Sequence, residues 1–202
     1  MFKSLLVLLA VLGTTTLSAQ QPVPDPVEGL PYYQIPDYPE TVNGPTVLAR
    51  MIDGLGYRYY WATEGLRAED LAYEPGNEGQ NMERLITHLF GLSETILNTA
   101  LNQPNIRPLD AVEIPWEAKR AQTLLNLKRA ADLFRELPAD QLANRELIFQ
   151  RGERKSRFPI WQTINGPLAD AIYHTGQIVA YRRTAGNPIH PEVNVFIGKT
   201  GN

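Results

Sequence analysis

Apolar residues recur at steps of three and four positions in four separate stretches of the chain. These stretches cover about residues 45–66, 81–97, 116–137 and 167–185. Such steps place the apolar side chains on one face of a helix, so each stretch predicts an amphipathic α-helix. The fourth helix has two possible starts, at Pro167 or earlier near Pro159 with a kink at Pro167.

Four amphipathic helices predict an all-α protein, with a four-helix bundle over residues 45–188. Cofactor sites in such bundles are built from inward-facing side chains on neighbouring helices. The sequence contains no internal repeat and no stretch rich in strand signals. Its 202 residues, 43% of them hydrophobic, are enough to bury a core without crosslinks.

A proline-rich arm over residues 20–44 precedes the predicted bundle, and a tail over residues 189–202 follows it. Proline fixes φ and lacks an N–H donor, so neither a helix nor a central strand is expected in the arm. Two interpretations are open: a disordered leader, or an extended arm that lies across the domain. The second draws on the apolar and aromatic side chains of the arm, which are Tyr32, Tyr33, Ile35 and Tyr38.

The first nineteen residues have the layout of a secretory signal peptide. Lys3 precedes an apolar run over residues 5–12, and small and polar residues lead to Ala19, where we expect cleavage. The run is too short for a permanent membrane anchor, which needs about 20 residues. We therefore expect export. The chain has no cysteine, which excludes disulfides and a lipid-modified cysteine.

Charge gives a weaker indication of partners. Without Lys3 the chain has 18 basic and 22 acidic side chains, a net charge of −4, which argues against a general nucleic-acid binder. Residues 144–158 are locally basic, and we interpret them as a solvated face, with a binding patch for an anionic ligand as the alternative. The cations of this basic segment are Arg145, Arg151, Arg154, Lys155 and Arg157.

Three side chains are candidate metal ligands: His88, Asp170 and His174. Asp170 and His174 stand four residues apart, so on a helix they share one face. His88 shares its row with Leu85 and other apolar residues, which predicts a place on the inner side of its helix. Together they would form a two-histidine, one-carboxylate site that leaves coordination positions open. The plainer alternative is a core histidine, with Asp170 favouring the helix dipole.

The segments "THLFGLSE" and "DAIYHTGQIVAYRRTAGNP" resemble the two motifs of the DinB-like (DinB/YfiT) superfamily. The resemblance covers residues 45–188, and "INGPLADAIYHTGQ" and "NVFIGKT" further resemble a secreted bacterial branch. It implies a four-helix bundle whose second and last helices supply three metal ligands, here His88, Asp170 and His174. Asp170 departs from the family pattern, where many members have histidine. We expect a divalent metal ion, zinc or nickel first and iron or manganese as alternatives.

An open metal site predicts a metal-dependent hydrolase that acts on an unknown small molecule. Tyr173, Gln177 and Tyr181 are acid/base candidates by location only, and we expect His190 to be an ordinary surface residue. A non-catalytic binding module is the alternative. A metal-dependent thiol transferase, also implied by the resemblance, is disfavoured because an oxidising exterior would not keep small thiols reduced. We also expect a homodimer through an apolar stripe on the first or third helix.

Overall fold

The computed structural model describes residue 25 and residues 27–76, 79–107 and 114–201. The predicted signal peptide and the start of the arm lie outside the described residues. No helix within the described ranges is long and apolar enough to span a bilayer.

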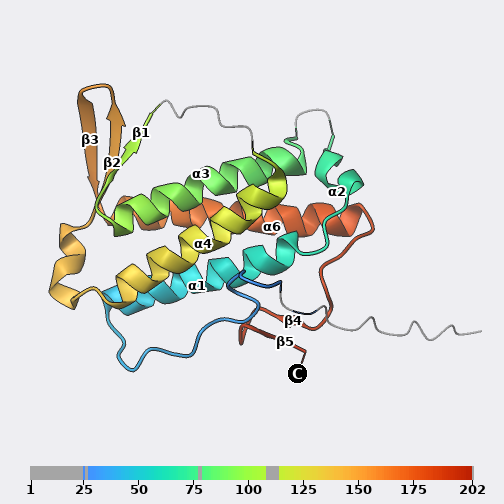
Figure 1. Cartoon of the computed structure of the whole chain (residues 1–202), viewed down its shortest axis with the longest axis horizontal. Helices are drawn as coiled ribbons and strands as arrows, with labels where there is room; N and C mark the ends of the chain where they lie inside the picture. The colour runs from blue at the N-terminus through green and yellow to red at the C-terminus, as the bar shows by residue number, and fades with distance from the viewer. Residues whose placement is uncertain (1–24, 26, 77–78, 108–113, 202) are drawn as a thin grey trace, which may run out of the picture.

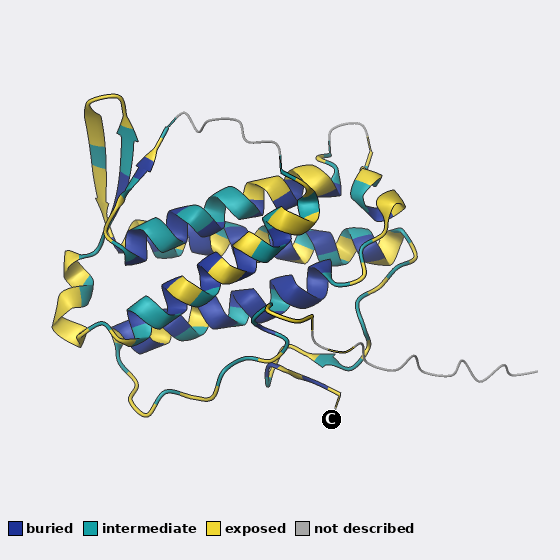
Figure 2. Cartoon of the chain, viewed as in Figure 1, coloured by how far each residue is buried: buried dark blue, intermediate teal, exposed yellow. Residues whose placement is uncertain are grey.

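Four long helices correspond to the four predicted stretches. They are α1 (Gly44–Thr63), α3 (Met82–Ala100), α4 (Trp116–Arg135) and α6 (Ala169–Thr184) (Figure 1). Helix α3 packs against α4 and α6, and α1 packs against the same two helices, so each long helix has two neighbours. The buried positions lie mainly on the faces turned toward these neighbours (Figure 2). Large core side chains include Ile52, Tyr59, Trp61, Ile86, Leu127 and Phe134.

Short elements connect and flank the long helices. They are α2 (Ala68–Ala72), a 3₁₀ turn (Ala139–Asn144), α5 (Trp161–Thr163) and a π turn (Ile164–Leu168). Helical backbone therefore starts at Trp161 and continues through the π turn, which contains Pro167, into α6. This matches the earlier of the two predicted starts. Proline lacks the N–H that an α-helical turn would use, and the π turn accommodates that loss.

The prediction of an all-α protein is wrong, because the chain also forms two small sheets. Strand β1 (Pro104–Ile106) pairs in parallel with β2 (Glu146–Arg151), and β2 pairs antiparallel with β3 (Arg154–Pro159). Strands β4 (Val193–Asn194) and β5 (Lys199–Thr200) form the second sheet within the tail. The basic segment is thus largely a hairpin, which stands at the end of the bundle where α3 finishes (Figure 1).

Local chemistry explains the hairpin. Gly152 takes a φ of 56° at the first position of a two-residue turn, where type II′ turns require glycine. Asn105 of β1 joins the sheet to the bundle, because it donates to the Ile148 carbonyl over 3.1 Å and accepts from Asn98 of α3 over 3.0 Å. Frequent charged residues on β3 hide the alternation that marks a strand.

The described part of the arm is extended and lies against α1 (Figure 1). The Tyr32 side chain is buried, and its hydroxyl donates to the carboxylate of Asp53 over 3.0 Å. The Trp61 indole donates to the Tyr33 carbonyl over 3.2 Å, and the Ile35 N–H donates to the carbonyl of Gly198 in the tail over 2.9 Å. Of the two interpretations of the arm, the described residues follow the one in which it crosses the domain.

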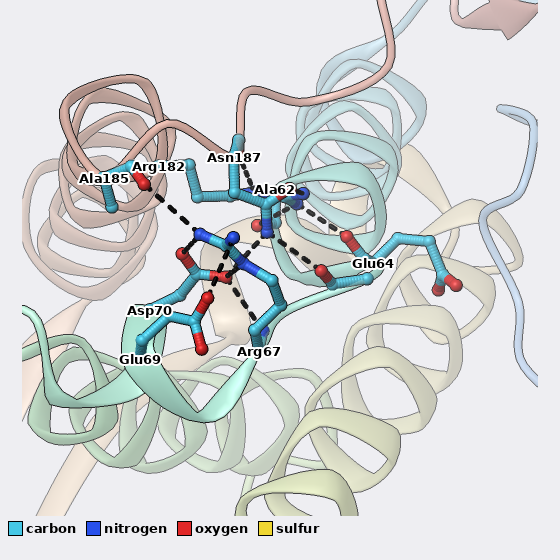
Figure 3. Close-up of polar contacts among 9 residues, drawn as sticks. Ala62, Glu64, Arg67, Glu69, Asp70, Arg182, Ala185 and Asn187 are labelled. Atoms are coloured by element: carbon cyan, nitrogen blue, oxygen red, sulfur yellow. Dashed lines mark hydrogen bonds and ion pairs between the residues drawn. The ribbon is translucent and has the colours of Figure 1, made fainter. Parts of the chain in front are cut away.

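Arg182 joins the C-terminal end of α6 to the C-terminal end of α1 (Figure 3). Its side chain is buried, and one of its guanidinium nitrogens donates to the carbonyls of Trp61, Ala62 and Glu64. The last carbonyls of a helix have no partner within the helix and carry partial negative charge, so a cation stabilises them.

Asp70 extends this cluster to α2. Its buried carboxylate accepts from the Arg67 side chain over 2.8 and 3.0 Å and from the Asn187 amide over 2.6 Å (Figure 3). The hydrogen bonds from Arg67 lower the pKa of Asp70 to about 2, against desolvation, which acts in the other direction. The cluster therefore holds α1, α2 and α6 in one arrangement.

Replacing Gly56 by alanine is expected to destabilise the protein. Alanine in place of a helical glycine normally stabilises by about 0.5–1 kcal/mol. At Gly56, however, the new Cβ would lie 2.4 Å from the Tyr32 ring. We expect Gly56→Ala to lower the free energy of unfolding by about 1–3 kcal/mol in urea denaturation. Gly91→Ala in α3 is the matched control, because its Cβ would meet no atom within 4 Å. A stabilised Gly56→Ala would contradict the docking of Tyr32.

Replacing Asp70 by asparagine is expected to lower stability at neutral pH. Because the pKa of Asp70 is lowered in the folded state, its contribution is complete above the unfolded pKa near 4 and is lost as the pH falls through about 2. We expect Asp70→Asn to cost about 1–2 kcal/mol at pH 7, and the difference from wild type to shrink as the pH approaches 2.

Denaturant unfolding across that pH range measures this difference. Glu69→Gln is the control, because Glu69 pairs with the same Arg67 but its side chain is 68% exposed. An exposed pair contributes little, so this variant should stay close to wild type. Equal stability of Asp70→Asn and wild type at pH 7 would argue against the assigned role of Asp70.

Candidate metal centre

The three predicted ligands come together where α3 packs against α6. His88 Nε2 lies 3.0 Å from Asp170 Oδ2, and His174 Nε2 lies 3.2 Å from Asp170 Oδ1. One ligand atom from each residue lies within 4.8 Å of the other two. The two imidazole rings are edge to face, with centroids 4.7 Å apart. This His88–Asp170–His174 group could hold a metal ion.

The predicted inner position of His88 is wrong. Its side chain is 43% exposed, that of Asp170 is 41% exposed and that of His174 is 18% exposed, so the group lies at the outer seam between α3 and α6. The inward row of α3 is instead formed by Leu85, Ile86, Leu89 and Ile96. His88 lies to the side of that row, where α6 covers it only in part. A ligand or water molecule can therefore reach the group from solvent.

The position of Asp170 depends on the turn before it. Asp170 is the second residue of α6 and directly follows the π turn at Ile164–Leu168. A π turn contains an extra residue, so it shifts the face on which later side chains lie, and such turns are frequent at functional sites. The negative charge of Asp170 in the first turn of α6 also interacts favourably with the helix dipole, without any metal. That effect does not require the carboxylate to contact two imidazoles.

Gln177 orients His174 from one turn further along α6. The Gln177 Oε1 atom lies 2.6 Å from His174 Nδ1, and its amide nitrogen donates to the Tyr173 hydroxyl over 3.4 Å. The Tyr173 ring also contacts His174, with centroids 5.3 Å apart. Metal-binding histidines usually have such a partner on the second ring nitrogen. Gln177 and Tyr173, which were acid/base candidates by location only, thus contact His174 directly.

The hydrogen bond to Gln177 fixes which nitrogen of His174 carries its proton. An amide oxygen only accepts, so the proton lies on Nδ1, and the neutral ring has a lone pair on Nε2. That lone pair faces Asp170 Oδ1 at 3.2 Å. Two acceptors at this distance repel each other unless a cation or a proton lies between them. A cation bound between His174 Nε2 and Asp170 Oδ1 would remove this repulsion.

The distances suit a small divalent ion. Bonds of about 2.0–2.2 Å at angles between octahedral and tetrahedral place neighbouring ligand atoms about 2.8–3.6 Å apart. Both contacts to Asp170 fall in this range, at 3.0 and 3.2 Å. The two contacts end on different oxygens of Asp170, and one ligand atom from each of the three residues lies within 4.8 Å of the other two.

Two other sequence candidates lie elsewhere. The Tyr181 ring packs against Tyr73, with centroids 5.6 Å apart. His190 accepts from the Glu192 N–H over 3.3 Å and is not part of the group. Comparison of the chain with models of known protein families, with curated proteins and with solved structures finds no match.

Proposed function

We propose that this chain is an exported, DinB-like protein that binds a divalent cation through His88, Asp170 and His174 and hydrolyses a small molecule there. The observation that carries the proposal is the convergence of three ligand atoms within 4.8 Å at an exposed seam. The family motifs in the sequence support it, because their ligand positions are the three residues that meet. Two nitrogens and one carboxylate oxygen favour zinc or nickel, with iron or manganese as alternatives.

A bound divalent cation would supply Lewis acidity and lower the pKa of a coordinated water. The three ligands leave coordination positions open, and the exposure of His88 and Asp170 leaves room for a substrate. Gln177 keeps the Nε2 lone pair of His174 directed toward Asp170. The Tyr173 hydroxyl lies beside this group on a side chain that is 64% exposed, so it can donate a hydrogen bond to a substrate.

A non-catalytic binding module is the second candidate. In such a module the aromatic side chains of the arm would bind the partner. Two of them are not free to do so, because Tyr32 is buried and Tyr33 packs against Tyr60 and Trp61. A metal-dependent thiol transferase fits the same ligands but not an oxidising exterior. Export and a homodimer stay predictions, and so does the absence of a nucleic-acid partner or a stable membrane anchor.

Metal binding is tested by elemental analysis of protein loaded with zinc or nickel and then desalted. We expect about one ion per chain in wild type and less than about a tenth of that in His174→Ala, which loses one of three ligands. Asp170→His should keep the ion, since many family members have histidine there. His190→Ala is the matched control and should bind like wild type. Wild type without metal, or His174→Ala with full metal, would exclude the site.

Hydrolysis is tested with panels of ester, amide and phosphate substrates. We expect one class to be turned over, with a loss of at least about a hundredfold on chelation and recovery when the metal is restored. His174→Ala should lose the same activity, while His190→Ala should retain it. Equal turnover by wild type and His174→Ala would reject the hydrolase. Stoichiometric metal without any turnover would favour the binding module.

A further inference from the structure

A cleft of about 410 Å³ opens on one face of the three-stranded sheet and shares no residue with the His88–Asp170–His174 group. Three arginines, two phenylalanines and one serine line it: Arg107, Phe149, Arg151, Arg154, Ser156 and Phe158. We propose that this arginine cleft binds a small organic anion that combines an aromatic ring with a phosphate group. The proposal concerns a second site and does not depend on the function proposed above.

Strand register places the cleft residues on one face of the sheet. Phe149 is paired with Ser156 and Arg151 with Arg154, and directly paired residues point to the same side. In β1, Asn105 is paired with Phe149, so Arg107, two residues later, falls on the side of Arg151. Strands β2 and β3 and the residue that follows β1 therefore contribute one arginine each to the rim of a single cleft.

Aromatic side chains form the apolar part of the cleft. The Phe149 and Phe158 rings lie edge to face with centroids 6.4 Å apart. The Arg107 guanidinium lies over the Phe149 ring, 5.8 Å from its centroid. Phe158 is 39% exposed, which is unusual for a phenylalanine without a partner. An aromatic ring can stack here while its charged group meets the arginines.

The two faces of the hairpin differ in how their cations are compensated. On the opposite face Arg157 forms an ion pair with Glu146. On the cleft face, neither Arg151 nor Arg154 pairs with a carboxylate of a described residue within 4.0 Å. Arg107 donates to Thr95 Oγ1 over 3.3 Å, and Glu94 is close enough for its charge to interact with Arg107. The two positive charges of Arg151 and Arg154 therefore remain, equal in number to the two negative charges of a phosphate dianion.

Ligand class follows from these groups. The guanidinium fork matches two oxygens of a phosphate, which is why arginine is common in phosphate recognition. The phenylalanine rings favour a ligand with an aromatic part over inorganic phosphate. The volume of about 410 Å³ lies within the range of small-molecule sites. An aryl phosphate is the simplest ligand that uses all three features.

The arginine cleft and the metal group can be tested separately. Thr95, which holds Arg107, follows His88 by seven residues on α3, or about 10 Å along the helix axis. The two sites share no side chain. Binding in the cleft is therefore expected to need no cation and to be unchanged in His174→Ala.

Phenyl phosphate is the probe, and calorimetry at low ionic strength with a chelator present is the measurement. We expect saturable binding to wild type, at least about fivefold tighter than inorganic phosphate because of the ring. Arg154→Gln should weaken binding about tenfold. Lys155→Gln is the matched control, because it removes the same charge from the next residue. Lys155 is paired with Gln150 and lies on the other face of the hairpin. This variant should change the affinity less than about twofold.

Three outcomes would overturn the proposal. Equal losses in Arg154→Gln and Lys155→Gln would mean that general charge, not the cleft, attracts the anion. Equal affinities for phenyl phosphate and inorganic phosphate would remove the role of Phe149 and Phe158. Binding to vesicles of anionic lipid without any binding of phenyl phosphate would point to a membrane surface instead. Far-ultraviolet circular dichroism of each variant establishes that the fold is retained.

Discussion

The axial register of α6 against its neighbours is the constraint on which the candidate metal centre depends. His88 belongs to α3, while Asp170 and His174 belong to α6, so only the packing of these two helices brings them together. A slide of α6 by one turn would move its carboxylate about 5.4 Å along the axis. That displacement exceeds the 3.0 Å contact between His88 and Asp170. Whatever fixes α6 along its length therefore fixes the site.

Two sets of contacts, one at each end of α6, set this register. At the C-terminal end, Arg182 occupies the carbonyl end of α1 and is itself held by Asn187, which binds Asp70 (Figure 3). At the N-terminal end, the π turn ends directly before α6, and Thr163 in the preceding turn donates to Thr99 of α3 over 3.4 Å. Polar contacts suit this task because they are directional, whereas apolar packing tolerates small slides. The buried Arg182 cluster thus helps to fix the helix positions on which the exposed His88–Asp170–His174 group depends.

The sequence predicts features that depend on residues close together in the chain, and it does not predict features that depend on contacts between distant residues. The four long helices were predictable because apolar spacing repeats over at least four turns in each, and the pairing of Asp170 with His174 is a property of one helix. The exposure of His88 was not predictable. The position of a residue on its own helix does not show how much of that residue a neighbouring helix covers. The sheets were missed since β1 has three residues and pairs with a strand over forty residues later. The docking of Tyr32 depends on a φ of 77°, which its sequence does not signal.

Helix α3 relates the two proposed sites to each other. One row of its side chains enters the core, His88 faces α6, and Thr95 accepts a hydrogen bond from Arg107, the residue after β1. A cation at the first site and two uncompensated arginines at the second would both add positive potential along one helix of a chain whose formal net charge is −3. Local potentials of this kind raise the concentration of anions near a surface even when the whole protein repels them. Under the two proposals, the positive potential at each site would attract anions from solution.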